Sequence, residues 1–171
     1  AADLIVQGDK QGASVKDLRL ILNKKGEKSV LAATGQVGWG EKLSWQATLH
    51  GEQIDPGIFF PEWAGNITTD ITSQGQKKGE EITGKVQIEQ LSGRLRDLPL
   101  SGSGQIRLKD KLILLNNIRL GMGSGKVRIH GSADREQQLD LRFEAKSANL
   151  ADLLPGTQGK LQLQGVLQGV L

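Results

Sequence analysis

Cysteine is missing from this sequence of 171 residues, and tyrosine is missing as well. The absence of cysteine excludes disulfide bonds and thiolate metal ligands. It leaves the redox compartment open, because a chain without cysteine suits an oxidising space as well as a reducing one. Aromatic residues are limited to 3 Trp and 3 Phe, so few large side chains are available to fill a deep core.

Long apolar runs are also missing. No stretch approaches the roughly 18 consecutive apolar residues of a membrane-spanning helix, and no window places apolar residues at helical spacing over three turns. The 22 basic and 19 acidic residues give a net charge of +3 and are interspersed along the chain. A nucleic-acid-binding protein more often gathers its basic residues in a stripe with aromatics between them, so we expect no nucleic-acid partner.

Glycine, by contrast, is frequent at 23 of 171 residues, which is about twice its ordinary usage. Most glycines end or interrupt short segments in which apolar and polar residues alternate, as they do in residues 139–145. Such alternation is typical of strands with one apolar face, and turn signals between the segments predict about eleven or twelve strands. Two segments that carry a proline near the end, residues 55–61 and 149–154, are expected to form single helical turns.

One segment breaks the alternation. Leu112, Leu114, Ile118 and Leu120 share a parity, and Asn116–Asn117 between them indicates a break or a turn. Elsewhere the glycines at Gly84 and Gly165 fall inside predicted strands, where a missing side chain lets a sheet bend sharply.

These strands predict an all-β fold with a packing problem, because no helix is available to cover their apolar faces. The linkers are too short for parallel crossovers, so we expect an antiparallel sheet. A sandwich, a closed barrel and a single curved sheet would each solve the problem. The scarcity of aromatics favours the third, an elongated, curved sheet folded into an open trough with an apolar concave face; a β-sandwich or barrel is the alternative.

A diverged internal repeat covers residues 18–67 and 118–161. Residues 29–54 overlay residues 125–150 without a gap, so that Gly35 meets Gly131 and Leu43 meets Leu139. Repeated units of this kind predict a stackable architecture whose length grows with copy number. We therefore expect residues 1–171 to be one continuous β-repeat fragment of a longer chain.

No group of residues predicts catalysis. His50 and His130 each follow an inward apolar residue and are expected to face solvent, and no carboxylate pair stands out as a buried acid and base. The glycine-rich residues 121–125 precede a strand rather than a helix, so a hairpin turn is expected there instead of a phosphate loop. We predict no enzymatic activity, no cofactor and no metal site.

The apolar stripe of the predicted strands is the main candidate site. Water solvates such a surface unfavourably, at roughly 25 cal/mol per Å², so it needs acyl chains, a hydrophobic polypeptide or another sheet. The residues expected to line this groove are Leu43, Trp45, Ala47, Leu49, Ile67, Ile71, Ile82, Val86, Ile88, Ile106, Leu108, Val127, Ile129, Leu139, Leu141, Phe143, Leu161 and Leu163.

A second candidate is the aromatic-rich segment of residues 54–63. Its Phe59, Phe60 and Trp63 either form a lip at the groove edge that contacts lipid or a partner, or belong to an ordinary turn that closes the core. The matching segment of the repeat carries Leu153 and Leu154, which favours the second interpretation.

The order of these motifs resembles the repeats of the TamB family, part of the wider AsmA-like group. The resemblance is carried by Gly35-Gln36-Val37, residues 43–49, Ile54-Asp55 and residues 61–67, with a downstream echo at residues 148–156. It implies a long sheet curled into a hydrophobic trough, within an inner-membrane-anchored protein of the translocation and assembly module of Gram-negative bacteria. The implied partners are phospholipid acyl chains or a hydrophobic client polypeptide, and an Omp85-type outer-membrane barrel protein reached through the full-length chain.

Two functions from different classes follow as expectations. The first is a non-enzymatic segment of a periplasm-spanning groove that conducts phospholipid, supports outer-membrane protein assembly, or does both. The second is a closed β-sandwich that serves as a structural or adhesive module with no apolar ligand.

Overall fold

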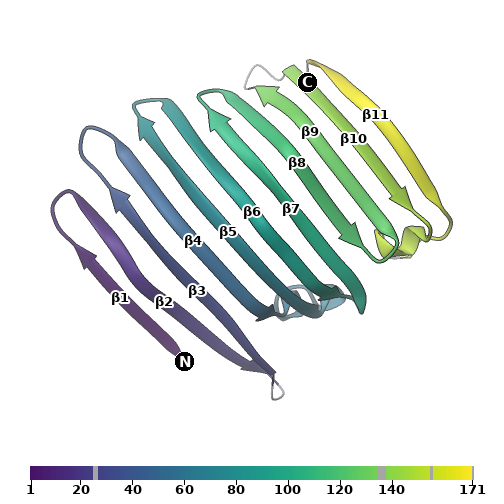
Figure 1. The fold of residues 1–171 in the computed structure, drawn as a ribbon, viewed down its shortest axis with the longest axis horizontal. Helices are drawn as coiled ribbons and strands as arrows, with labels where there is room; N and C mark the ends of the chain where they lie inside the picture. Colours follow the sequence, from purple (N-terminus) through teal and green to yellow (C-terminus); the bar gives the residue numbers. More distant parts are fainter. Residues whose placement is uncertain (25–26, 135–137, 155, 171) are drawn as a thin grey trace.

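A computed structural model describes residues 1–24, 27–134, 138–154 and 156–170 of the chain. It shows one sheet of 11 strands that follow each other in sequence order from β1 to β11 (Figure 1). Every neighbouring pair is antiparallel. Because β1 and β11 are the two edges, the sheet is open, which confirms the predicted all-β, antiparallel and unclosed architecture and excludes a closed barrel for the described residues.

The strand bounds agree with the alternating segments of the sequence. The strands are β1 (Ala2–Gly8), β2 (Gly12–Lys24), β3 (Glu27–Gly38), β4 (Leu43–Ile54), β5 (Gly65–Lys78), β6 (Glu81–Leu95), β7 (Leu98–Lys109), β8 (Leu112–Met122), β9 (Gly125–Asp134), β10 (Gln138–Ser147) and β11 (Leu161–Val170). The glycine-rich residues 121–125 lie at the turn between β8 and β9, as predicted.

The two predicted helical turns form short 3-10 helices at the same end of the strands (Figure 1). They are η1 (Pro56–Ile58) and η2 (Pro61–Trp63) between β4 and β5, and η3 (Leu150–Asp152) between β10 and β11. Asp55 caps η1 and Asn149 caps η3, each by accepting a hydrogen bond from a backbone N–H two residues on, which is the ordinary capping chemistry of these side chains. Pro155, which the sequence places after η3, lies outside the described residues.

Asn116–Asn117 does not break the chain into two strands. β8 continues through it with a β-bulge, since the register with β9 shifts between Leu115 and Ile118, and Asn117 has a φ of 50°. A bulge adds one residue to a strand and so exchanges the faces of the side chains beyond it. Although the four residues share a parity in the sequence, Leu112 and Leu114 therefore lie on the opposite side of the sheet from Ile118 and Leu120.

The buried core is small and lies near the end that carries the 3-10 helices. Among the described residues, the buried apolar side chains are Leu95, Leu100 and Met122, which are 9%, 8% and 4% exposed. Partly buried apolar side chains, including Trp63 of η2, pack against this cluster. A single layer of sheet has no second layer to pack against, so the rest of its apolar surface is only partly covered.

Candidate functional site

The register of the sheet gathers the predicted groove residues on one side. Cross-strand partners in a sheet point to the same face, and Leu49 pairs with Ile71, which pairs with Ile88. Farther along, Ile129 pairs with Phe143. When the pairs are followed from β4 to β11 in this way, all of the residues predicted for the groove lie on the same side. We call this side the apolar face.

Further apolar residues share this face although they were not among the predicted site residues. The β-bulges place them on this face. Where the alternation of apolar and polar residues shifts by one position, a bulge adds one residue and returns the following apolar side chains to the apolar face. These residues include Leu4, Val6, Val15, Leu18, Leu20, Leu31, Val37, Leu91, Leu100, Ile113, Leu115, Ile118, Leu120 and Leu167.

Much of the apolar face is open to solvent. Leu43 and Leu120 are each 41% exposed, and Leu163 is 48% exposed. In a globular domain such positions would be covered by a second layer, but the described chain forms a single sheet. The face therefore offers apolar side chains in rows that run from strand to strand.

Two aromatic rings on this face lie over glycines of nearby strands. A Cβ on Gly165 would lie 2.8 Å from Cζ of Phe143, and one on Gly84 would lie 3.2 Å from Cζ2 of Trp45. Gly75, on the strand between Trp45 and Gly84, has the same ring directly over its α-carbon. The glycines inside strands thus make room for side chains from the next strand, a role that the alternation pattern does not reveal.

The three aromatic residues of the candidate lip differ in burial. Trp63 is partly buried and packs against the core cluster, whereas Phe59 and Phe60 are 76% and 65% exposed. Leu154, which follows η3 at the same end of the sheet, is 55% exposed. One aromatic therefore closes the core, and the two others project beyond it.

Arg96 links the segments around η2 and η3. It lies in the turn between β6 and β7 with a φ of 52°, and its guanidinium carbon lies 5.5 Å from the centroid of the Trp63 ring. Its Nη2 donates a hydrogen bond of 3.2 Å to the carbonyl of Ala151 in η3. Arg96 therefore connects η2 with η3 at this end of the sheet.

Asp152 fastens η3 to the turn between β8 and β9. The backbone N–H of Ser124 donates to its carboxylate at 2.7 Å, and Asn149 Nδ2 donates at 3.0 Å. The hydrogen bonds from Ser124 lower the pKa of Asp152 below its ordinary value of 3.8, with smaller contributions from Asn149 and from the charge of Arg96. Asp152 as a whole residue is 7% exposed, and its carboxylate accepts hydrogen bonds from donors that stabilise its charged form.

The two histidines lie on exposed parts of the strands, as predicted. His50 Nδ1 lies 2.6 Å from Asp70 Oδ1, and both side chains are substantially exposed. Within the described ranges, no three His, Cys, Asp or Glu side chains come together in a way that could hold a metal ion. Nor does any described helix have the length and apolar character needed to cross a membrane.

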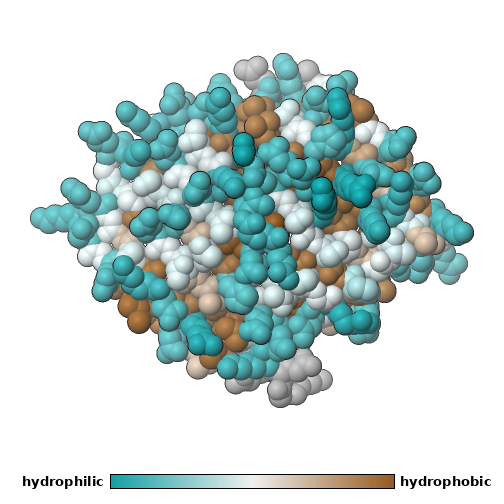
Figure 2. All heavy atoms as spheres, in the orientation of Figure 1, coloured by the Kyte–Doolittle hydropathy of each residue, from teal (hydrophilic) through white to brown (hydrophobic). Residues whose placement is uncertain are grey.

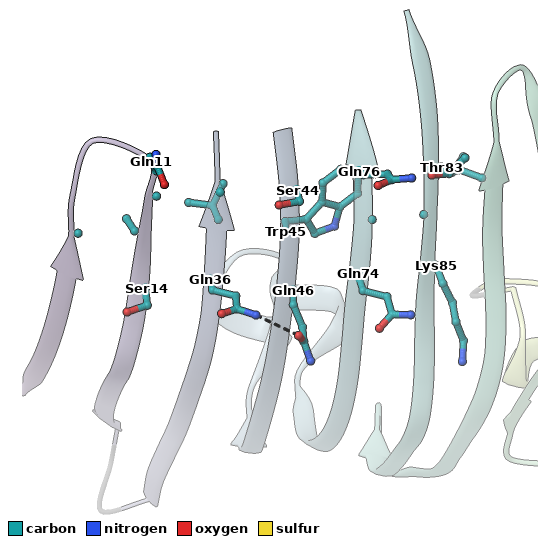
Figure 3. Close-up of a pocket in the computed structure, with 18 of the residues that line it drawn as sticks. Gln11, Ser14, Gln36, Ser44, Trp45, Gln46, Gln74, Gln76, Thr83 and Lys85 are labelled. Carbon is teal, nitrogen blue, oxygen red and sulfur yellow. Dashed lines mark hydrogen bonds between the residues drawn. The ribbon is translucent and has the colours of Figure 1, made fainter. Parts of the chain in front are cut away.

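The side opposite the apolar face carries a different feature. An open hollow of about 1230 Å³ lies over β1 to β8 and is lined mostly by polar side chains, among them Gln36, Gln46, Gln74 and Lys85 (Figure 3). Of the predicted groove residues, only Trp45 and Leu108 contribute to its wall. Hydrophilic side chains also dominate the side of the molecule seen in Figure 2. We call this side the polar face; the sequence pattern predicts solvated positions there but not the hollow.

Comparison with known protein families gives one result. A family model described as TamB, N-terminal domain, matches residues 1–171 and so spans every strand of the sheet. No curated protein and no solved structure matches the chain.

Proposed function

This chain belongs to the TamB family, and from this membership we propose that its sheet is a non-enzymatic segment of a hydrophobic groove that conducts phospholipid across the periplasm. The family is a transport and assembly module of the bacterial envelope that works with an outer-membrane partner. We propose that the chain acts within an inner-membrane-anchored protein of a Gram-negative bacterium. Its partner, reached through the full-length chain, is an Omp85-type barrel protein.

The uncovered apolar face carries this proposal. Leucines such as Leu120 and Leu163 keep 41% and 48% of their surface exposed, and similar residues continue in rows across the sheet. Removing apolar surface from water contributes roughly 25 cal/mol per Å², and an acyl chain laid along a row would remove its own surface as well. Acyl chains can slide along such rows because dispersion and the hydrophobic effect require no fixed partner.

A hydrophobic client polypeptide is a second candidate cargo, favoured by the same exposed apolar side chains. Leu4 on β1 and Leu167 on β11 are 61% and 51% exposed, so the apolar face offers contacts across the whole described sheet. An extended client strand would bury its own apolar side chains against these rows. This route would support outer-membrane protein assembly.

The exposed Phe59 and Phe60, which we propose as the lip, lie where the apolar face ends. We propose that they contact the lipid as it enters or leaves the groove, while Trp63 holds the segment against the core. Aromatic side chains suit this position because they are stable at the boundary between lipid and water.

Native mass spectrometry of protein purified from membranes tests the proposal. We expect co-purified phospholipid, which a photo-crosslinkable phospholipid should also label on the apolar face. Leu141→Glu and Leu163→Glu place charges on that face and should reduce labelling, whereas Gln46→Glu places the same charge on the polar face and should not. Labelling that is equal in all three variants, or delipidated protein that binds neither phospholipid nor an apolar dye, would contradict the proposal.

A further inference from the structure

The hollow on the polar face is built on one continuous row of cross-strand partners. Each member pairs with the next on the neighbouring strand, so the side chains stand about 4.8 Å apart. The row consists of Gln7, Ser14, Gln36, Gln46, Gln74, Lys85, Arg107 and Leu114, and its central members are visible in Figure 3.

The middle of this row consists of side-chain amides, some of whose donor and acceptor groups have no partner among the described residues. Gln36 Nε2 donates to Gln46 Oε1 at 3.2 Å, and the Nε2 group of Gln46 donates no hydrogen bond to any described residue. Gln74 makes no side-chain hydrogen bond with any described residue. Because each amide carries both a donor group and an acceptor, the row suits a ligand whose own groups both donate and accept, and hydroxyl groups do so.

The end of the row toward β7 is positively charged. Lys85 and Arg107 are direct cross-strand partners, and Lys109 lies one row away in the wall of the same hollow. Like charges placed directly opposite each other are destabilising. Among the residues that the structure describes, none of these three cations forms an ion pair with a carboxylate. An anionic group between Lys85 and Arg107 would relieve their repulsion and form charge-assisted hydrogen bonds.

We propose that the hollow binds an acidic oligosaccharide, whose hydroxyl groups hydrogen-bond along the amide row and whose carboxylate lies between Lys85 and Arg107. A row of aromatic platforms, on which single-stranded nucleic acids stack, is not present: Trp45 is the one aromatic residue in the described wall, and its ring lies over Gly75 on the apolar face. An acidic peptide would satisfy the cations but would offer few hydroxyls to the amides. The site lies on the opposite face from the proposed lipid groove and is independent of it.

Isothermal titration calorimetry at low salt, with three hexameric probes, tests this inference. Hexagalacturonate carries both hydroxyls and carboxylates, maltohexaose carries hydroxyls but no carboxylate, and hexaglutamate carries carboxylates and backbone amides but no hydroxyls. We expect hexagalacturonate to bind about tenfold or more tightly than either of the others, the effect of losing one charge-assisted or several neutral hydrogen bonds.

Matched variants locate the site. Lys85→Gln combined with Arg107→Gln should weaken hexagalacturonate binding about tenfold, and Gln46→Ala combined with Gln74→Ala should also weaken it. Arg119→Gln combined with Arg142→Gln removes two exposed cations of the same face outside the hollow and should leave binding unchanged, with circular dichroism confirming that each variant is folded. The inference is overturned by equal binding of hexaglutamate, by an equal effect of the Arg119 and Arg142 pair, or by no binding of hexagalacturonate to the folded protein.

Discussion

Replacement of two leucines by glutamate, Leu100→Glu and Leu120→Glu, distinguishes an open apolar face from a covered one. Both leucines lie on the apolar face in the neighbouring strands β7 and β8, and their rows are adjacent because Leu120 pairs with Gly102. They differ in exposure, since Leu100 is 8% exposed and Leu120 is 41% exposed. The substitution is chemically identical at the two positions, so a difference in destabilisation reports the surroundings.

The expected magnitudes follow from these exposures. Full burial of a leucine side chain contributes about 1.5–3 kcal/mol, so the part of Leu120 that is buried contributes about 1–2 kcal/mol to the free energy of unfolding. A glutamate there can extend its carboxylate into water and adds little further cost. At Leu100 the carboxylate is buried among Met122 and its neighbours, so the loss should exceed about 4 kcal/mol.

Urea denaturation followed by tryptophan fluorescence measures both losses, with Gln46→Glu on the polar face as a control that should change the free energy of unfolding by less than about 0.5 kcal/mol. Leu120→Glu should remain folded with a lowered midpoint, and Leu100→Glu should be largely unfolded without denaturant. If Leu120→Glu proves as damaging as Leu100→Glu, the apolar face is covered in solution by a second layer or a second copy. The apolar face would then not be free to bind lipid.

Three further perturbations have defined outcomes. Arg96→Ala removes the cation–π contact and the carbonyl hydrogen bond that tie η2 to η3, and should lower the free energy of unfolding by about 1–2 kcal/mol in urea titrations; no change would mean that these contacts do not stabilise the folded chain. Gly165→Val forces a side chain against the ring of Phe143 and should cost about 1–3 kcal/mol, measured by the same titration and relieved when that ring is replaced by alanine. Because hydrogen bonds from Ser124 lower the pKa of Asp152, the folded state is stabilised above the ordinary value of 3.8 and loses this stabilisation as the pH falls through the lower folded pKa. The urea midpoint should therefore fall more steeply below about pH 4 in the wild type than in Asp152→Asn, and parallel pH profiles would refute the assignment.

The alternation of apolar and polar residues predicted the strands, and the short linkers between them predicted antiparallel pairing. The alternation failed where a strand carries an extra residue, as at Asn116–Asn117, because a bulge leaves the chain extended while exchanging the faces. The exchange is visible only once pairing with β9 is known. The short helical turns were easier to predict, because a proline near the end of each segment is a local signal; the structure adds the caps from Asp55 and Asn149.

The two candidate sites also differ in how far the sequence alone could predict them. Residues such as Leu49, Ile71 and Ile88 could be assigned to one face because parity within each strand is a local property. The polar hollow depends on register, since Lys85 and Arg107 are 22 positions apart in the sequence (107 minus 85) and become partners only through the pairing of β6 with β7. The internal repeat stays a prediction, supported by η1 and η3 beginning 94 residues apart (150 minus 56).

The position of the core explains how a single sheet can remain folded while it keeps an apolar face available. Leu95, Leu100 and Met122 are buried at the end where Trp63 and the η3 segment fold against the strands. Burial there stabilises the strand ends and the register that follows from them, because a shift by one residue would exchange the two faces along the whole strand. The rows toward the other end then need not be covered for the register to hold. We infer that the capped end stabilises the sheet, and that the open rows are left free to bind an apolar ligand.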